Sequence, residues 1–293
     1  MTGSNFEEIR LDTPRGNFAG LRWGKRGGRP VLALHGWLDN AASFVPMAEA
    51  MQTSGALDGI DLVAIDLAGH GHSAHRVDGA WYHFVDYGDD IDAVLDALGW
   101  DHCDLLGHSL GGAIATVFAV AAPERVERLV LIEALGPLPW QPGTAAASLA
   151  GARRDRSAWR RKQLRVFSDP ADAVRARQQA NDLSEPVARL LVERGLTLVD
   201  GGYAWRSDPR LTLTTPLRAS EAQIGEWIDA IDCPALLIGS DPPSSVLAEE
   251  MRQSRVQRLR RVEQVLLPGG HHLHMENPAP VAQAVSDFLA LTA

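Results

Sequence analysis

The chain has 293 residues, of which 45% are hydrophobic and 22% are charged, and its formal net charge is −9. This composition is typical of a globular protein with a substantial core, and the length suits one large domain or one domain with an insertion. The acidic balance argues against nucleic acid as the main partner, because binding to phosphates requires a basic face.

The first half of the chain alternates predicted strands with predicted helices. Residues Glu8–Leu11 and Asn17–Trp23 alternate apolar and polar side chains around a Pro-Arg-Gly turn, which predicts an antiparallel hairpin. Short unbroken apolar runs then predict strands buried on both faces, and apolar residues spaced about 3.6 positions apart predict helices. The strands are expected at 30–34, 60–65, 103–106 and 128–132, and the helices from 43 onward, at 85–98 and at 113–122.

The alternation stops between about 136 and 230, where the sequence shows helical periodicity and no convincing buried strand. It resumes with a strand at 234–238, a helix around 244–260, a strand at 263–267 and a final helix at 278–291. Strands that alternate with helices imply a mostly parallel sheet with right-handed crossovers. We therefore expect an α/β fold whose core is formed by residues 1–135 and 231–293, with a helical cap inserted at 136–230.

The predicted cap is rich in tryptophan and in basic side chains. Its tryptophans, Trp140, Trp159, Trp205 and Trp227, predict an apolar lid that excludes water from a cleft, or else simple packing of the cap onto the core. A basic run usually forms a solvated helix face, and attraction of anionic substrates is the alternative. The run consists of Arg153, Arg154, Arg156, Arg160, Arg161, Lys162 and Arg165.

Several signals are missing from the sequence. Residues Met1–Glu8 contain neither a basic stretch nor an apolar run, so no secretory signal peptide is expected. The longest apolar runs, such as 113–122, are too short to span a bilayer, and we expect a cytoplasmic protein without a membrane span. Cys103 and Cys233 lie in apolar, strand-like segments, which predicts buried free thiols, and no second ligand pair accompanies them to suggest zinc.

The segment Gly107-His108-Ser109-Leu110-Gly111 fits the G-x-S-x-G pattern between a predicted buried strand and a small-residue helix. In this context the motif forms a sharp turn, the nucleophile elbow, that projects the serine oxygen into a cleft. The helix N-terminus beneath the serine suits a developing oxyanion. Ser109 is therefore the candidate nucleophile, and the alternative is a glycine-rich turn whose serine merely caps the helix.

A serine nucleophile needs a base, and a cluster of histidines lies between the last predicted strand and the last predicted helix. His271 directly follows a glycine pair and lies nearest the strand end, so it is the candidate base. His272 and His274 are expected to pack or to form hydrogen bonds. A metal site is not expected, because no matching set of carboxylates accompanies these histidines.

The histidine in turn needs an acid to orient it, and two strand ends offer one. Glu133 closes the strand at 128–132, and Asp241 follows the strand at 234–238, so both face the carboxyl edge of the sheet, where ligands bind. A glutamate directly after four apolar residues is hard to explain as part of a core. Asp241 precedes a proline, which is ordinary turn chemistry. Glu133 is favoured, and Asp241 remains the alternative.

Taken together, these segments resemble the α/β-hydrolase family along the whole chain. More narrowly, the chain is similar to serine hydrolase-like proteins related to haloalkane dehalogenases and epoxide hydrolases. The resemblance implies an α/β-hydrolase fold: an eight-stranded, mostly parallel sheet with helices on both faces and an inserted helical cap. The matching segments are 35–39, 66–73, 107–111, 131–137 and Gly270-His271 followed by His274 and Glu276.

The resemblance also bears on the roles of single residues. In this fold the loop after the third strand and the residue after the nucleophile each supply an oxyanion-hole N–H, which points to the backbones of Trp37 and Leu110. The side chain of Trp37 is expected to form a pocket wall. Some dehalogenases carry a glutamate where Glu133 falls. Most esterases carry an aspartate in a G-x-x-D pattern, and the segment that ends at Asp241 is one residue shorter.

Dehalogenases and epoxide hydrolases carry an aspartate at the elbow, so Ser109 argues against those two activities. A serine attacks acyl carbons and forms an acyl-enzyme that water can cleave. The leading hypothesis is a serine hydrolase that cleaves the carboxylic ester of a small or medium acyl substrate, with no metal and no organic cofactor. The alternatives are hydrolysis of a C–C bond or a lactone on the same triad, and a non-catalytic binding protein on this fold.

Overall fold

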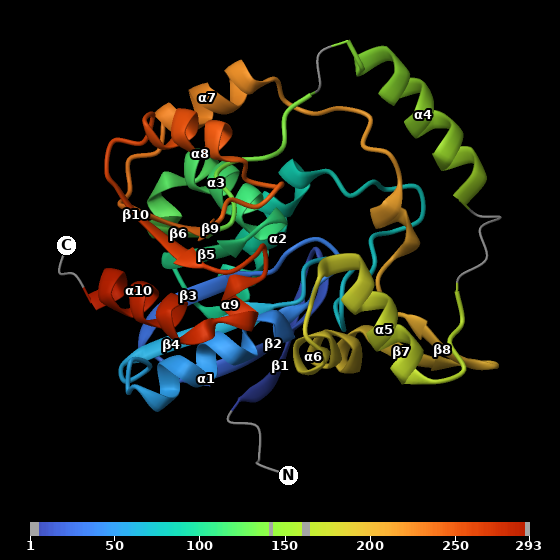
Figure 1. Cartoon of the computed structure of the whole chain (residues 1–293), viewed down its shortest axis with the longest axis horizontal. Coiled ribbons are helices and arrows are strands. Elements are labelled where there is room, and N and C mark those ends of the chain that lie inside the picture. Colours follow the sequence, from blue (N-terminus) through green and yellow to red (C-terminus); the bar gives the residue numbers. More distant parts are fainter. Residues whose placement is uncertain (1–5, 141–142, 160–164, 291–293) are drawn as a thin grey trace.

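The computed structural model describes residues 6–140, 143–159 and 165–290, and in these ranges helices cover both faces of a central sheet (Figure 1). Eight strands form that sheet in the order β1-β2-β4-β3-β5-β6-β9-β10. The hairpin β1–β2 is antiparallel, and every pairing from β4 to β10 is parallel, which confirms the predicted architecture. The strands are β1 (Glu7–Thr13), β2 (Gly16–Gly24), β3 (Arg29–Leu34), β4 (Ile60–Ile65), β5 (Cys103–His108), β6 (Val126–Ile132), β9 (Ala235–Asp241) and β10 (Val262–Pro268).

The central strands are covered on both faces. Every residue of β4 and β5 is buried, which explains why both strands read as nearly continuous apolar runs. Their two carboxylates are exceptions that carry partners: Asp61 pairs with Arg22, and Asp104 pairs with Arg29. Buried carboxylates are tolerated when a cation and hydrogen bonds replace the lost water.

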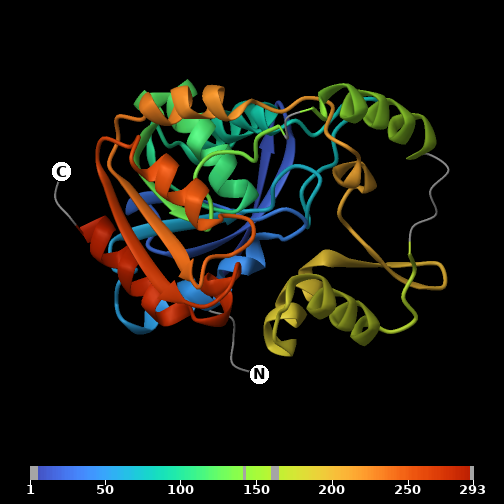
Figure 2. The ribbon, with the colours of Figure 1, turned by 45° about the horizontal axis from the view of Figure 1, so that its top comes forward.

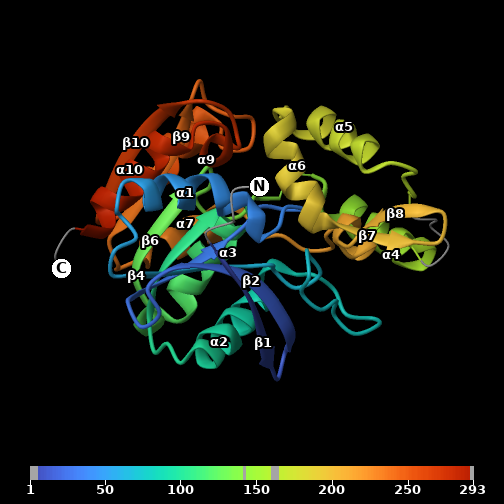
Figure 3. The same cartoon turned by 90° about the horizontal axis from the view of Figure 1, so that it is seen from below.

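Helices lie on opposite faces of the sheet (Figures 1 and 3), and an apolar cluster lies beneath each layer of helices. One cluster includes residues of α2, α3 and α7, with α8 at its margin. The other cluster includes residues of α1 and α10. The helices of these layers are η1 (Ala41–Phe44), α1 (Val45–Thr53), η2 (Phe84–Asp86), α2 (Tyr87–Leu98), α3 (Leu110–Ala121), η3 (Pro123–Arg125), α7 (Glu221–Asp229), α8 (Glu249–Val256), α9 (Leu273–Glu276) and α10 (Pro278–Ala290).

The segment between β6 and α7 extends from one end of the molecule (Figure 2). It has its own small apolar cluster, to which α9 of the core contributes Met275. A two-stranded hairpin lies inside this segment, for which the sequence predicts helices and no convincing buried strand. Its strands are four residues each, and among them only Ala204 is fully buried, so they leave no buried-strand signal. The elements are α4 (Ala145–Ala158), α5 (Pro170–Asn181), α6 (Glu185–Gly195), β7 (Leu196–Val199), β8 (Gly202–Trp205) and η5 (Pro209–Thr212).

Helix α7 corrects the predicted boundary of the cap. Its side chains Ile224 and Ile228 are fully buried in the same apolar cluster as α2 and α3. A capping box formed by Ser220 and Gln223 starts this helix. We therefore propose that the inserted cap ends before Ser220, and not at 230 as the loss of strand pattern suggested.

The basic run of the cap lies largely on exposed surface. Helix α4 buries only Ala152, and its arginines Arg153 and Arg154 are exposed, as is Arg165 beyond it. Arg156 is also exposed, but its guanidinium lies 4.4 Å from the centre of the Trp81 ring of the core. The remaining basic residues of the run, Arg160, Arg161 and Lys162, lie outside the described residues.

Neither cysteine forms a disulfide. Cys103 is buried, as predicted, whereas Cys233 is half-buried. Burial raises the pKa of the Cys233 thiol to about 11, and it raises that of Cys103 further. Within the described ranges, no helix combines the length and the apolar character needed to cross a membrane.

Candidate active site

Ser109 occupies the tight turn between β5 and α3. Its backbone φ of 51° lies in the left-handed region, which is strained for a residue with a side chain. The turn is possible because its neighbours are glycines: a Cβ on Gly107 would lie 2.5 Å from Gly111, and a Cβ on Gly111 would lie 2.0 Å from the Leu34 carbonyl oxygen. The Ser109 side chain makes no capping hydrogen bond to α3, so the alternative role of a simple helix cap does not describe it.

The imidazole of His271 lies between Ser109 and Glu133. Its Nε2 is 2.9 Å from Ser109 Oγ, and its Nδ1 is 3.3 Å from Glu133 Oε2. In a neutral ring this geometry lets the serine hydroxyl donate to Nε2 while Nδ1–H donates to the carboxylate. The arrangement is that of a serine nucleophile, its base and an orienting acid.

Glu133 follows β6 directly and is 1% exposed. Burial alone raises the pKa of a carboxyl group. Here hydrogen bonds from His271, from the Ser244 side chain and from the Ser240 backbone N–H outweigh burial and hold the pKa of Glu133 below its usual range. The Ser240 N–H lies 2.6 Å from Oε1. The buried carboxylate is therefore ionised and fixed in direction.

Asp241, the alternative acid, is exposed at the end of β9. Within the described residues it makes no hydrogen bond or ion pair with His271. The neighbouring residue, Ser240, instead directs its backbone N–H to Glu133. The structure thus brings Glu133, and not Asp241, to the imidazole.

The two backbone N–H groups expected to bind an oxyanion border the same cleft. Leu110 is the first residue of α3, where a helix leaves its N–H groups without intrahelical acceptors. Trp37 lies in a turn closed by a 3.1 Å hydrogen bond from the Asp39 N–H to the Gly36 carbonyl. Leu38 in that turn has a φ of 59°. Strained backbone angles thus occur in the oxyanion turn, at the nucleophile and at Glu133, whose φ is 53°.

A cleft of about 720 Å³ opens above these groups, with walls from both the core and the inserted segment. Trp37 and Trp140 form part of the wall, and the Trp37 indole donates to the Leu211 carbonyl at 3.1 Å. About half of the other side chains of the wall are aromatic or aliphatic, and the rest include a group of threonines and the arginines Arg210, Arg218 and Arg255. These residues include Trp81, Tyr82, Phe84, Tyr87, Leu135, Leu138, Leu211, Leu213, Met251, Thr212, Thr214 and Thr215.

Of the other tryptophans of the predicted cap, Trp205 and Trp227 have packing roles, and the Trp159 ring lies 5.7 Å from the guanidinium of Arg210, which lines the cleft. Trp205 packs edge-on against Phe167 inside the inserted segment. Trp227 lies against Phe84 of the core. The residues of the inserted segment that line the cleft come mainly from 136–140 and 210–218, and helices α4 and α5 add Ser148 and Asn181.

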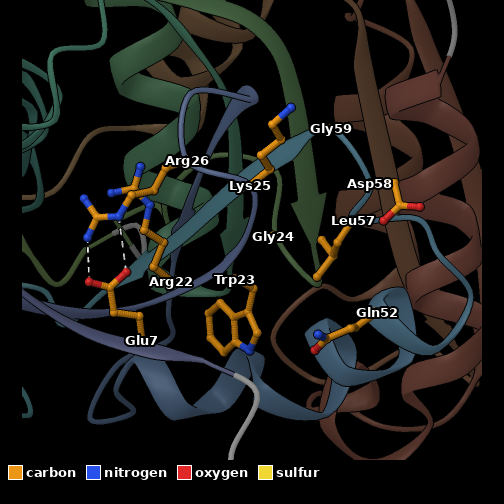
Figure 4. A pocket seen from close by; sticks show the side chains of 10 residues that line it. All are labelled: Glu7, Arg22, Trp23, Gly24, Lys25, Arg26, Gln52, Leu57, Asp58 and Gly59. Atoms are coloured by element: carbon orange, nitrogen blue, oxygen red, sulfur yellow. Dashed lines mark hydrogen bonds and ion pairs between the residues drawn. The ribbon is translucent and has the colours of Figure 1, made fainter.

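A second cavity, of about 640 Å³, lies at the opposite edge of the sheet, beside the end of β2 and the start of β4 (Figure 4). Three of its charged side chains have partners, because Arg26 pairs with Glu7 and Arg22 pairs with Asp61. Parallel strands present their ligand sites at their carboxyl ends, and this cavity is at the amino ends of β3 and β4. It is separate from the serine site.

His272 and His274 do not point at the serine. With His108 of the elbow they form a buried group of imidazoles behind His271, and the ring centres of His108 and His274 are 4.1 Å apart. Asp39 adjoins this group. Sequence reasoning assigned no role to His108 or Asp39, although both lie inside the motif segments 107–111 and 35–39. Among the residues described, no histidine, cysteine or carboxylate cluster has a metal-binding arrangement.

The site can be compared with those of known proteins. A sequence model of the alpha/beta hydrolase fold matches residues 29–278. A serine hydrolase-like protein of Danio rerio is 32% identical over 294 residues, covering 96% of this chain and 88% of that protein. A solved structure of a hypothetical protein from Pseudomonas aeruginosa PAO1 is 40% identical, with a TM-score of 0.90 and coverage of 97% and 100%. The thioesterase domain from the curacin biosynthetic pathway is 28% identical, with a TM-score of 0.82 and coverage of 96% and 98%.

Proposed function

This chain belongs to the α/β hydrolase fold family, and from that premise we propose that it is a serine hydrolase that cleaves carboxylic esters of small or medium acyl substrates. The observation that carries the proposal is the contact series from Ser109 Oγ to His271 Nε2, at 2.9 Å, and from His271 Nδ1 to Glu133, at 3.3 Å. This series supplies a nucleophile, a base and an orienting acid in one cleft.

The reaction proceeds in two acyl-transfer steps. Ser109 Oγ attacks the ester carbonyl carbon while its proton passes to His271 Nε2. The N–H groups of Trp37 and Leu110 stabilise the oxyanion of the tetrahedral intermediate. His271 then gives the proton to the leaving alcohol, and an acyl-enzyme remains. Water activated by the same histidine cleaves the acyl-enzyme, and Glu133 stabilises the imidazolium in both steps.

The walls of the cleft support an apolar substrate. A volume of about 720 Å³ falls in the range of small-molecule sites, and its aromatic and aliphatic lining suits an acyl chain. We propose that residues 136–219 act as a cap that shields the acyl-enzyme from bulk water. The 28% identity to a thioesterase domain supports acyl transfer as the reaction class.

The test combines active-site labelling with a substrate panel. A fluorophosphonate probe should label Ser109 in the native protein and should fail to label Ser109→Ala. A panel of p-nitrophenyl esters of graded chain length, with a thioester and a lactone for comparison, should show the highest kcat/KM for one of the esters. Absence of labelling and of turnover would favour a binding protein on this fold instead.

A further inference from the structure

A buried carboxylate behind the site contacts three separate parts of the chain. Asp39 is 3% exposed and closes the turn that carries the Trp37 N–H. Its Oδ1 accepts a hydrogen bond from Arg177 of α5, in the inserted cap. Its Oδ2 lies 3.4 Å from His272 Nε2 and 3.8 Å from His108 Nδ1. One side chain therefore joins the cap, the histidine loop and the nucleophile elbow.

The charge of Asp39 is maintained by these neighbours. Burial alone raises the pKa of such a carboxyl group, but the Arg177 guanidinium and the hydrogen bond from His272 hold it well below its usual range. Arg177 is itself buried. A buried ion pair fixes its two elements tightly, because breaking it leaves an uncompensated charge.

The turn before Asp39 depends on this anchor. Leu38 is held at a φ of 59°, a strained angle that persists only when the surrounding structure imposes it. A Cβ on Gly36 would lie 2.8 Å from Asp39 Oδ2 and 2.9 Å from His108 Nδ1, so the turn rests directly on both groups. The direction of the Trp37 N–H is thereby linked to the position of the carboxylate.

His108 extends the connection to the catalytic pair. It precedes the nucleophile in the chain, is fully buried, and its Nε2 donates to the His271 backbone carbonyl at 2.8 Å. This hydrogen bond ties the elbow to the loop that carries the base. The opposite ring nitrogen, Nδ1, lies 3.8 Å from Asp39 Oδ2, a contact without a hydrogen bond.

We infer that Asp39 is a positioning residue for acyl transfer: its carboxylate holds the oxyanion turn and the histidine loop in register and couples both to the cap through Arg177. The inference rests on the proposed function, because the reaction that the turn and loop serve is that hydrolysis. Cap docking and assembly of the oxyanion site are then one event. A cap displaced from Arg177 would leave Ser109 in place but without a fixed Trp37 N–H.

The direct test is Asp39→Asn, which preserves shape and removes the charge. We expect kcat on a short p-nitrophenyl ester to fall about 10- to 100-fold with little change in KM, because the oxyanion is bound only in the transition state. The affinity of a trifluoromethyl ketone, which mimics the tetrahedral intermediate, should fall by a similar factor. A raised KM with unchanged kcat would contradict the inference.

Two further variants separate positioning from stability. In Asp39→Asn/Arg177→Gln no buried charge is left unpaired, so much of the lost thermal stability should return while kcat stays low. Arg194→Gln is the control, because it breaks the buried ion pair with Asp66 that also joins the cap to the core. It should lower stability without lowering kcat. Recovery of kcat in the double variant would show that Asp39 has only a structural role. A loss of kcat in Arg194→Gln equal to that in Asp39→Asn would show the same.

Hydrogen exchange gives a readout that does not depend on turnover. In Asp39→Asn, amides in 35–39 and 270–274 should exchange faster than in the wild type, and in Arg194→Gln they should not. Fluorophosphonate labelling of the wild type tests the proposed hydrolase activity separately. Unchanged exchange in both segments would overturn the inference whatever the wild type hydrolyses.

Discussion

At the scale of single residues, the chemistry depends on a few side chains that contribute little to the core. Ser109→Ala removes one hydroxyl from a half-buried turn, so folding should remain nearly intact. We expect kcat to fall by roughly 10⁴- to 10⁶-fold, in line with the loss of a triad member elsewhere. Ester hydrolysis and thermal melting, measured together, check both expectations. Turnover close to the wild-type rate would mean that another group is the nucleophile.

The acid gives a second prediction at this scale, with a matched pair of variants. Glu133→Gln keeps the shape of the side chain but removes the charge that favours Nδ1–H and the imidazolium. The loss in kcat should approach ~10⁴-fold, as for a triad acid replaced by its amide. Asp241→Asn makes the same chemical change at an exposed position and should alter kcat little. If the two losses were exchanged, Asp241 would be the functional acid.

At the scale of elements, the strand ends and the glycines around them decide where the reactive groups lie. Gly111→Ala would place a Cβ 2.0 Å from the Leu34 carbonyl oxygen and force α3 away from β3. Overpacking of this kind costs about 1–3 kcal/mol of stability, and kcat should fall with it because the elbow moves. Gly88→Ala is the control: a Cβ there meets Phe118 at an ordinary 3.8 Å. Urea denaturation and kcat measurements on both variants test whether only Gly111→Ala loses stability and activity.

The sequence allowed most of the core elements to be predicted, because long buried strands and amphipathic helices carry a strong periodic signal. The hairpin β7–β8 and the short helix α9 carry too few residues for any period to emerge. The cap boundary that we propose before Ser220 differs from the expected one at 230 for another reason. Helix α7 continues the helical pattern of the cap but packs on α3, and periodicity does not say which partner a helix chooses.

The site was predictable where a motif fixes local geometry, as for Ser109 and His271. The choice between Glu133 and Asp241 required knowing how the turns after β6 and β9 direct their side chains, which depends on backbone angles such as the φ of 53° at Glu133. Asp39 was missed because its partners, Arg177 among them, lie far away in the chain. No local pattern records such a pairing.

At the scale of the whole molecule, buried neutral histidines make stability depend on pH. Burial lowers the pKa of His70 and of His274 from 6.5 to about 3. His274 faces His108, His272 and Phe44, with Asp39 as the nearby negative charge. Below pH 6.5 the unfolded chain takes up protons that the folded chain excludes, so stability is lost as pH falls toward 3.

The expected loss between pH 6.5 and 5 is about 2 kcal/mol for each of these two histidines, at about 1.4 kcal/mol per pH unit. Urea denaturation across this range measures it. His274→Phe should reduce the slope by about one proton. An equal slope in the wild type and in His274→Phe would show that this histidine is protonated in the folded state.

The cap is attached to the core by more than the two chain crossings that lead into and out of it. Buried ion pairs join Arg177 to Asp39 and Arg194 to Asp66, and each pair has one member in the cap and one in the core. The cap is therefore not a freely exchangeable module. A chimera that takes residues 136–219 from another family member will leave the buried carboxylates of Asp39 and Asp66 unpaired unless the donor supplies both arginines. Cap grafts that keep both members of each ion pair should yield soluble, folded hybrids. Grafts chosen to match only the length of the cap should not.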